Sequence, residues 1–345
     1  MSGHDRTPER SASAQLVDPP ALNIAVPPGI GDSVWGLMKV PALLKQTGAV
    51  CANVAICGDP ARESKPFIER FQFVNNVTYS SHRCLPEDRF TEEGVNNWTS
   101  SRRGWLGKFD WLLQANRWLE SGRRLENWLA GLETEWRIAD QFVFTGEEVR
   151  KARQLEEQLG PYCAFFLGPE RGNTVAGHNR GPLWSPEDWY RLAELCRSLG
   201  LAVVVVGANR DRSYFEKYFD SRLGESYNAI GKWHIGQTFA VIQRSRFMIS
   251  YQSGLGIFAV YMGVPTAISW RPHGDSLLPE GFLTFREEMA SAWAPPESLA
   301  SGRYLPLIYT RCSPESIIYH AKDHHWHLSG HQSSSPTSSQ GKVQP

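Results

Sequence analysis

The feature that most constrains this chain is a short apolar run that ends in a glycine turn and continues as a helix. Residues 22–26 are mostly apolar, the turn reads Gly29-Ile30-Gly31-Asp32, and apolar side chains recur at helical spacing through residues 33–47. This order predicts a strand, a tight turn and a helix. Glycines let the backbone approach a ligand closely, and a helix start offers free N–H groups. We expect Gly29 and Gly31 to line a ligand site, with Asp32 either at that site or acting only as the helix N-cap.

A second unit of the same kind lies in the other half of the chain. Residues 247–250 read as a strand, residues 251–256 as a turn, and residues 257–262 as an apolar helix that Gly263 closes. The next strand is predicted at 264–270. Two such units, one in each half, predict an α/β protein with two nucleotide-binding domains that face each other across a cleft.

The order of elements supports two domains between polar ends. We expect a disordered leader at 1–20, an N-terminal domain at 21–150, a C-terminal domain at 151–328 and a disordered tail at 329–345. Further strands are predicted at 53–57, 76–79, 141–144, 162–167, 201–206 and 228–230. Further helices are predicted at 61–70, 146–159, 185–198, 212–219 and 236–244. This alternation is typical of doubly wound parallel sheets.

Composition argues against a protein that binds nucleic acid or membranes through its net charge, and against a transmembrane or secreted protein. Lys plus Arg and Asp plus Glu number 36 each, so no net charge attracts the chain to nucleic acid or to an anionic membrane. No apolar run approaches the length of about 18 residues that would indicate a transmembrane helix. The N-terminal residues lack the apolar stretch of a signal peptide, and the six cysteines form no C-x-x-C pair. We therefore expect a cytoplasmic protein with reduced thiols.

Four motifs, in the same order along the chain, carry a resemblance to a known family. Gly29-Ile30-Gly31-Asp32 with Pro41-Ala42-Leu43 resembles the G-x-G-D … P-A-L opening of heptosyltransferase-like glycosyltransferases (glycosyltransferase family 9). Residues 184–189, Trp-Ser-Pro-Glu-Asp-Trp, resemble the W-P-x-E-x-W stretch of that family, and residues 203–207 its V-V-L-x-G strand and turn. Ser253-Gly254-Leu255 with residues 263–266, Gly-Val-Pro-Thr, resembles its D-S-G-x-x-H-x-A-x-x-x-G-x-P-T signature.

This resemblance implies a GT-B architecture of two Rossmann-like domains whose parallel sheets face each other. It implies a metal-independent, inverting glycosyltransferase that moves a sugar from a nucleotide-sugar donor to an acceptor hydroxyl, with no cofactor. Asp32 stands where the family has its catalytic base, so the resemblance assigns general-base work to Asp32. The chain itself contains no Asp-x-Asp, the carboxylate pair with which metal-dependent transferases hold a sugar diphosphate.

Donor-binding residues are expected in the C-terminal half. A helix that starts at Ser253-Gly254-Leu255 can hold a phosphate at its N-terminus. Gly207 and Lys232-Trp233 follow two other strands, where nucleotide-base contacts fall in this architecture, although Trp233 suits a packed core equally well. Arg180 lies on the loop after the strand at 162–167, where it could pair with the diphosphate or remain a solvated surface arginine.

The sequence departs from the family pattern at positions that would contact the donor. Gln252 stands where the family has Asp, and Ile257 stands where it has His. Pro182 and Leu183 precede Trp184 where a basic residue is usual. These departures leave the identity of the donor open.

A segment rich in Trp and Arg, residues 96–130, is the expected acceptor region. Trp111 and Trp118 are seven residues apart, which suits one buried helix face. Arg102, Arg103 and Trp105 show no such period and suit an acceptor loop, because aromatic faces stack on sugars and arginines bind phosphates. The same composition suits single-stranded nucleic acid, a less favoured partner.

Five histidines near the C-terminus, at 320, 324, 325, 327 and 331, suit adventitious metal binding rather than a catalytic metal site.

Four functional hypotheses follow. The favoured one is a glycosyltransferase that acts on a glycan precursor, and the second is the same chemistry on nucleic acid. A Rossmann oxidoreductase is disfavoured because position 34 is Val, so the first turn lacks G-x-G-x-x-G. A sugar-nucleotide-binding module without activity stays open, since Gln252 and Ile257 replace the family's Asp and His.

The Arg102-Arg103 pair generates a first prediction. If the acceptor is anionic or phosphorylated, replacing both arginines by alanine should raise the acceptor KM and leave donor affinity unchanged. Because the net charge is zero, salt should weaken binding of a small acceptor modestly and binding of a polymer such as DNA steeply. Steady-state kinetics of the double variant at two ionic strengths measure both effects. Normal acceptor kinetics would indicate that residues 96–130 contribute only to packing and to the protein surface, and not to acceptor binding.

Overall fold

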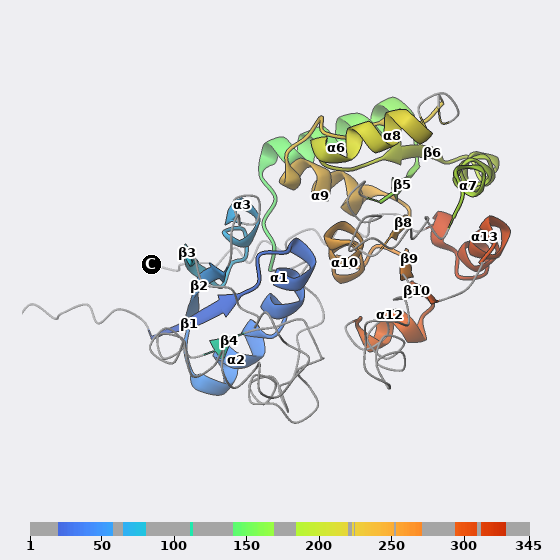
Figure 1. The fold of residues 1–345 in the computed structure, drawn as a ribbon. Coiled ribbons are helices and arrows are strands. Elements are labelled where there is room, and N and C mark those ends of the chain that lie inside the picture. The colour runs from blue at the N-terminus through green and yellow to red at the C-terminus, as the bar shows by residue number, and fades with distance from the viewer. Residues whose placement is uncertain are drawn as a thin grey trace, which may run out of the picture.

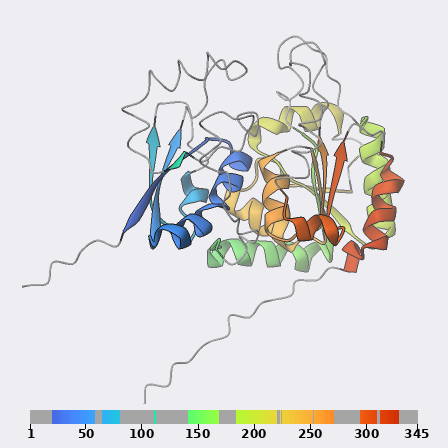
Figure 2. The same cartoon turned by 90° about the horizontal axis from the view of Figure 1, so that it is seen from below.

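The computed structural model (Figure 1) describes residues 20–57, 65–80, 111–112, 141–168, 184–219, 223, 225–251, 253–270, 294–308 and 312–328. Within these ranges the chain forms two parallel sheets, one in each half. Figure 2 shows the sheets as two separate groups of arrows, with helices of both halves between them. The α/β fold with two parallel sheets that the sequence predicts is therefore confirmed.

The first sheet has the order β3-β2-β1-β4. Its strands are β1 (Ala21–Val26), β2 (Cys51–Cys57), β3 (Val74–Ser80) and β4 (Trp111–Leu112), and all their pairings are parallel. Ile24 on β1 is fully buried whereas its neighbour Asn23 is exposed, as the alternation of side chains along a strand requires. Trp111 pairs with Ile24, so the predicted helix face is wrong for Trp111.

The predicted helix at 33–47 is in fact two helices, α1 (Ile30–Leu37) and α2 (Val40–Thr47). The helices are separated by a turn at residues 38–39. Pro41 lies in the first turn of α2, where its missing N–H costs no helical hydrogen bond. Gly48 ends α2 with a left-handed φ of 73°. The first half also contains α3 (Lys65–Ile68), inside the range predicted from the sequence.

The connection between the halves is bonded to both of them. The predicted strand at 141–144 is wrong: within it, only Phe142 pairs, in an isolated antiparallel bridge with Phe71. The amide of Val143 donates to the carbonyl of Arg70 at 3.0 Å. The chain then enters α6 (Gly146–Leu159), as predicted, through a capping box of Thr145 and Glu148. The helix α6 packs along α9 (Ile235–Arg244) of the second half.

The second sheet has the order β10-β9-β8-β5-β6-β7 and is parallel throughout. Its strands are β5 (Tyr162–Phe166), β6 (Ala202–Val205), β7 (Tyr227–Asn228), β8 (Met248–Tyr251), β9 (Thr266–Trp270) and β10 (Tyr304–Ile308). The remaining helices are α7 (Pro186–Ser198), η4 (Asn209–Asp211), α8 (Arg212–Tyr218), α10 (Gly254–Tyr261), α12 (Pro296–Ala300), α13 (Pro314–Asp323) and η5 (Trp326–Leu328). Strands and helices alternate as predicted.

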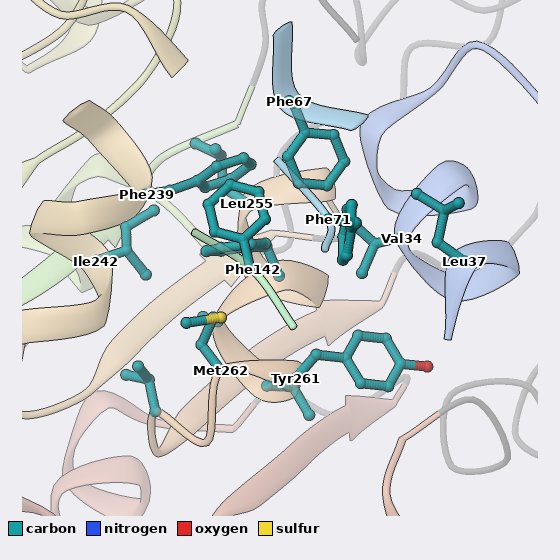
Figure 3. Close-up of a cluster of buried hydrophobic side chains, with 14 of the residues drawn as sticks. Val34, Leu37, Phe67, Phe71, Phe142, Phe239, Ile242, Leu255, Tyr261 and Met262 are labelled. Carbon is teal, nitrogen blue, oxygen red and sulfur yellow. The ribbon is translucent and has the colours of Figure 1, made fainter. Parts of the chain in front are cut away.

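One hydrophobic core runs through both halves. Phe67 of α3 lies 5.5 Å from Phe142 and 5.2 Å from Phe239 of α9, measured between ring centroids. Phe142 lies 5.3 Å from Phe258 of α10. Figure 3 shows labelled side chains from these separate elements converging on this cluster. The second core cluster, which includes Trp189 and Phe247, lies wholly in the second half.

Because Phe142 bridges the two halves, its truncation tests how much stability depends on this core. Phe142 is 5% exposed, and Phe142→Ala should lower the free energy of unfolding by about 3–5 kcal/mol through lost burial and a cavity. Urea unfolding followed by circular dichroism measures the change. Val143 is 48% exposed, so Val143→Ala is the matched control and should change stability by less than about 0.5 kcal/mol. Equal effects of the two variants would contradict a shared core.

Candidate active site

The first glycine turn leads directly into α1. The N-cap of α1 is Gly29, and no side chain caps the helix there. The hydroxyl of buried Ser33 donates to the carbonyl of Pro27 at 2.6 Å and ties the turn to the end of β1. Asp32 is the third residue of α1, so its interpretation as the N-cap is wrong; its side chain lies outside what the structure describes.

The second glycine turn leads into α10, three residues earlier than predicted. Ser253 is the N-cap, and its hydroxyl accepts a hydrogen bond from the amide of Gly256 at 3.2 Å. The hydroxyl of Ser250 lies 2.9 Å from that of Ser253 and fixes the turn to the end of β8. Among the residues described, none accepts a hydrogen bond from the amides of Gly254 or Leu255. These two amides are therefore available to an anion, and the anion binding expected from the sequence stays a prediction.

The two glycine turns lie against each other. A Cβ atom placed on Gly31 would lie 2.8 Å from Cδ1 of Ile257 and 3.2 Å from Cα of Gly254. A Cβ atom placed on Gly254 would lie 2.8 Å from the amide nitrogen of Gly31 and 2.8 Å from Cβ of Ile30. A Cβ on Gly254 would displace backbone, whereas a Cβ on Gly31 would chiefly displace the flexible end of the Ile257 side chain. The structure thus brings together two predicted site elements that are more than two hundred residues apart in sequence.

This contact places two helix N-termini, each with a partial positive charge, at one point. An anionic group bound beside the contact would be favoured by both helices.

The contact also affects what a larger residue at Gly254 would do to the protein. Such a residue would separate the two turns even without a ligand, so that variant cannot report on donor binding alone.

The expected base-binding residues lie on two neighbouring loops of the second half, which follow β6 and β7. The amide of Gly231 donates to the carbonyl of Gly207 at 3.0 Å, which joins the ends of β6 and β7. The Trp233 ring stacks on Tyr227 at 5.8 Å with an angle of 17°, and the ammonium of Lys151 lies 6.0 Å from its centroid. Trp233 is half-buried against the shared core, so its faces already have protein neighbours. Lys232 is exposed and lies 5.1 Å from the Tyr227 ring.

Several predicted site residues lie outside the described part of the chain. These are Arg102, Arg103, Trp105, Arg180 and Gln252. The Trp-Ser-Pro stretch is described: Ser185 caps α7 in a capping box with Asp188, and Trp184 packs on Trp189 at 4.9 Å. That motif therefore builds the core of the second half.

A charged junction beside the shared core is not predicted from the sequence. Arg70, which follows α3, holds Glu148 of α6 with both guanidinium nitrogens, at 2.5 and 2.8 Å. The Glu148 carboxylate is fully buried, and a Cβ on Gly236 would lie only 1.9 Å from its Oε1. The pattern Thr145-x-x-Glu148 signals a capping box. No local pattern reveals that Arg70, seventy-eight residues earlier, supplies the counter-charge.

Electrostatics at this junction favour the ionised carboxyl. Burial alone would raise the pKa of Glu148, but hydrogen bonds from Arg70 and from the Thr145 amide outweigh burial and hold the pKa below its ordinary value. The ring of His234 lies 3.7 Å from the same carboxylate. At neutral pH the Glu148 carboxylate therefore stays ionised and paired with Arg70, at the point where the first half, α6 and the start of α9 meet.

No group of three or more His, Cys, Asp or Glu side chains in the described ranges is arranged to hold a metal ion. His320, from the histidine-rich end, instead bonds the carbonyl of Gly302 at 2.9 Å. None of the described helices has the length and apolar character needed to cross a bilayer.

Comparison with known proteins identifies the fold. No family model and no curated protein matches this sequence. The glycosyl transferase family 9 structure from Veillonella parvula DSM 2008 aligns with a TM-score of 0.52 and 13% identity, over 92% of this chain and 96% of that one. E. coli ADP-heptose LPS heptosyltransferase II aligns with a TM-score of 0.55 and 13% identity, over 90% and 98%. E. coli heptosyltransferase WaaC, solved with ADP, gives 0.54 and 11%, over 88% and 99%.

These similarities show that the chain has the GT-B fold of heptosyltransferases and related glycosyltransferases. The resemblance inferred from the four motifs is thus confirmed at the level of the fold. The glycine turns recognised in the sequence are the two helix starts that this fold brings into contact.

The charged junction generates a prediction about pH. Glu148→Gln should lower the free energy of unfolding by about 2–4 kcal/mol at pH 7, because Arg70 loses its buried counter-charge. The folded-state pKa of Glu148 is depressed, so its stabilisation is present above the ordinary carboxyl pKa and is lost as pH falls through the folded value. The difference between wild type and variant should therefore shrink in acid, as urea unfolding at several pH values would show. Glu194→Gln, in an exposed ion pair with Arg191, is the control and should leave stability unchanged.

Proposed function

We propose that this protein is a glycosyltransferase that moves a sugar from a nucleotide-sugar donor to an acceptor hydroxyl, with inversion and without a metal. The observation that carries the proposal is the contact between the turn that bears Asp32 and the free start of α10. A general base must lie within hydrogen-bond reach of the hydroxyl it deprotonates, and a leaving diphosphate needs donors close to the same reacting carbon. The two turns supply these two needs at one place in a fold shared with glycosyltransferases.

The donor diphosphate is assigned to the second half. The Gly254 and Leu255 amides at the start of α10 offer hydrogen bonds and the positive end of the helix dipole, beside Ser253. Gln252 and Arg180 belong to the same proposed subsite by their places in the sequence. Gly207, Lys232 and Trp233 stand at the ends of β6 and β7, and are assigned to the nucleotide. The WaaC structure of this fold was solved with ADP, which supports a nucleoside diphosphate here.

The acceptor is assigned to the first half. Gly29 is exposed at the N-cap of α1 and leaves room for it to approach the helix start, whereas Gly31 is closed in by Gly254 and Ile257 and would contribute only through its backbone. Arg102, Arg103 and Trp105 are the proposed contacts for a phosphorylated or otherwise anionic group. In the reaction, the Asp32 carboxylate accepts the proton of the acceptor hydroxyl, and the oxygen of that hydroxyl attacks the anomeric carbon of the donor sugar. The bond from that carbon to the diphosphate oxygen breaks, and the nucleoside diphosphate leaves with the electron pair. Attack opposite to the leaving group inverts the anomeric configuration.

A second candidate is a sugar-nucleotide-binding module that performs no transfer. The observation that favours it is Ile257, whose apolar side chain lies against Gly31 at the position where the resembling family has His. Binding without turnover separates this candidate from the enzyme. A thermal-shift screen with ADP-, GDP-, UDP- and CDP-sugars finds the donor, since a ligand that binds the native state raises its apparent stability.

Asp32→Asn tests the proposed base. This variant keeps the shape of the side chain but cannot take a proton, so transfer should fall by about 100-fold or more while the donor-induced thermal shift is kept. Product formation with the donor found in the screen, with EDTA present throughout, measures the loss; activity that requires added Mg²⁺ or Mn²⁺ would contradict metal independence.

The chain offers a matched control for this substitution. Asp188 is the third residue of α7, as Asp32 is of α1, so Asp188→Asn removes a carboxylate from the same helical position in the other part of the protein. Asp188→Asn should lower stability slightly and leave transfer unchanged. Normal turnover in Asp32→Asn would remove Asp32 as the base, and donor binding without turnover in the wild type would favour the binding module.

A further inference from the structure

One aromatic side chain of the first half is exposed on the face of the sheet that otherwise forms the core. Tyr79, near the end of β3, pairs with Ile56 of β2, which pairs in turn with Val26 of β1. Paired residues on neighbouring strands point to the same face, and Ile56 and Val26 are fully buried in the main core. Val77, two residues earlier on that face of β3, is also buried, yet Tyr79 is 47% exposed. The packing on this face therefore stops short of the end of β3.

This exposed ring lies at the edge of the sheet that carries the candidate site. The strands are parallel, so the end of β3 and the glycine turn after β1 lie at the same edge. Ligands of open α/β sheets bind outside the carboxyl ends of the strands. Val26 is the last residue of β1 and lies in one row with Ile56 and Tyr79, so two strand spacings, or about 10 Å, separate Tyr79 from the start of the turn to Asp32.

A cation from α3 lies beside the Tyr79 ring. The ammonium of Lys65, the first residue of α3, is 5.9 Å from the ring centroid. The Lys65 side chain is exposed and also lies 3.5 Å from exposed Glu69, one turn further along the helix. Ion pairs between exposed side chains are weak, so the ammonium can turn from Glu69 to a ligand at little cost. Phe67 anchors α3 in the core, so Lys65 is presented from a packed helix beside β3 (Figure 1).

An open aromatic ring beside an ammonium group suits a sugar. The C–H face of a sugar ring packs on an aromatic face, and an ammonium donates hydrogen bonds to hydroxyl or acidic oxygens. Another cation–ring pair of the described residues, Lys217 over Tyr218 at 4.9 Å, lies at the C-terminal end of α8, which leads away from the carboxyl end of β6. The pair at Tyr79 thus combines an exposed ring, a cation and the edge where ligands bind.

We propose that Tyr79 and Lys65 form a subsite for a second sugar unit of the acceptor, distinct from the unit whose hydroxyl is attacked beside Asp32. The separation of the two strand ends exceeds the width of one sugar ring, so one unit cannot occupy both places. The inference rests on the proposed function and makes the acceptor a glycan of two or more units. A polynucleotide is disfavoured, because a groove for single strands needs several stacking rings and a track of cations.

Saturation-transfer NMR tests this subsite without any transfer reaction. The probes are maltose, digalacturonic acid and a thymidine oligonucleotide. Both disaccharides should receive saturation from the wild type, and Tyr79→Ala should lower their signals by about threefold or more, because the stacking face is lost. Tyr79→Trp should keep the signals, and Lys65→Gln should weaken digalacturonic acid more than maltose.

The chain offers a matched control for these variants. Tyr218 is 43% exposed and has its own lysine partner, so Tyr218→Ala removes an equivalent ring away from the proposed subsite and should leave all signals unchanged. Equal disaccharide signals from wild type and Tyr79→Ala, no disaccharide signal from the wild type, or a signal from the oligonucleotide alone would overturn the subsite.

Kinetics separate this inference from the proposed function. Tyr79→Ala should raise the acceptor KM by about tenfold and leave kcat and the donor-induced thermal shift unchanged, because a subsite away from the reacting hydroxyl binds ground state and transition state alike. A wild type that binds the disaccharides through Tyr79 but transfers no sugar would contradict the proposed function and support the subsite. An unchanged acceptor KM in an active Tyr79→Ala enzyme would overturn the subsite and leave the proposed function in place.

Discussion

The close approach of Gly31 to Gly254 is the constraint on which the arrangement of this protein depends. Any side chain at either residue would meet backbone or branched carbon atoms of the other half at about the distance of a steric clash. This contact brings the starts of α1 and α10 together, and the core cluster that includes buried residues of both helices also contains the rings of Phe67, Phe239 and Phe258. Glycine therefore acts here through tertiary packing, since neither residue has a positive φ that would demand it locally.

The same contact carries an electrostatic cost. Each helix N-terminus bears about half a positive elementary charge, and two of them lie together. In the free protein, apolar burial between the halves and the Arg70–Glu148 pair oppose this repulsion. A bound diphosphate would convert the repulsion into attraction from both helices. The apolar interface and the proposed anion site are thus linked: packing holds together two helix starts that a ligand of negative charge would hold more strongly.

The sequence predicts most of the fold because strand–glycine–helix units carry local signals. Apolar runs next to glycines locate most strands of the second sheet, although β10 (Tyr304–Ile308) is missed, and Ser185-Pro186 locates the start of α7. The sequence also points to both helix starts of the candidate site. It does not predict that they touch, since contact depends on tertiary geometry. The break between α1 and α2 is missed because helical spacing of apolar residues continues across it, although Pro41 marks it. The Arg70–Glu148–Gly236 junction is missed because its parts come from three distant segments and only the capping box has a local pattern.

Ile257 shows how a departure from a family pattern can be understood physically. The side chain lies on the first turn of α10 and fills the space that the missing Cβ of Gly31 leaves, so an apolar residue here serves the packing of α1 against α10. A histidine at this position would bring a titratable ring to the start of the helix, where the partial positive charge disfavours its protonated form. In this chain the position offers no group that can take a proton. In the proposed reaction, proton transfer therefore falls to Asp32 on α1, and α10 contributes backbone amides and the rigid support of the turn that carries Asp32.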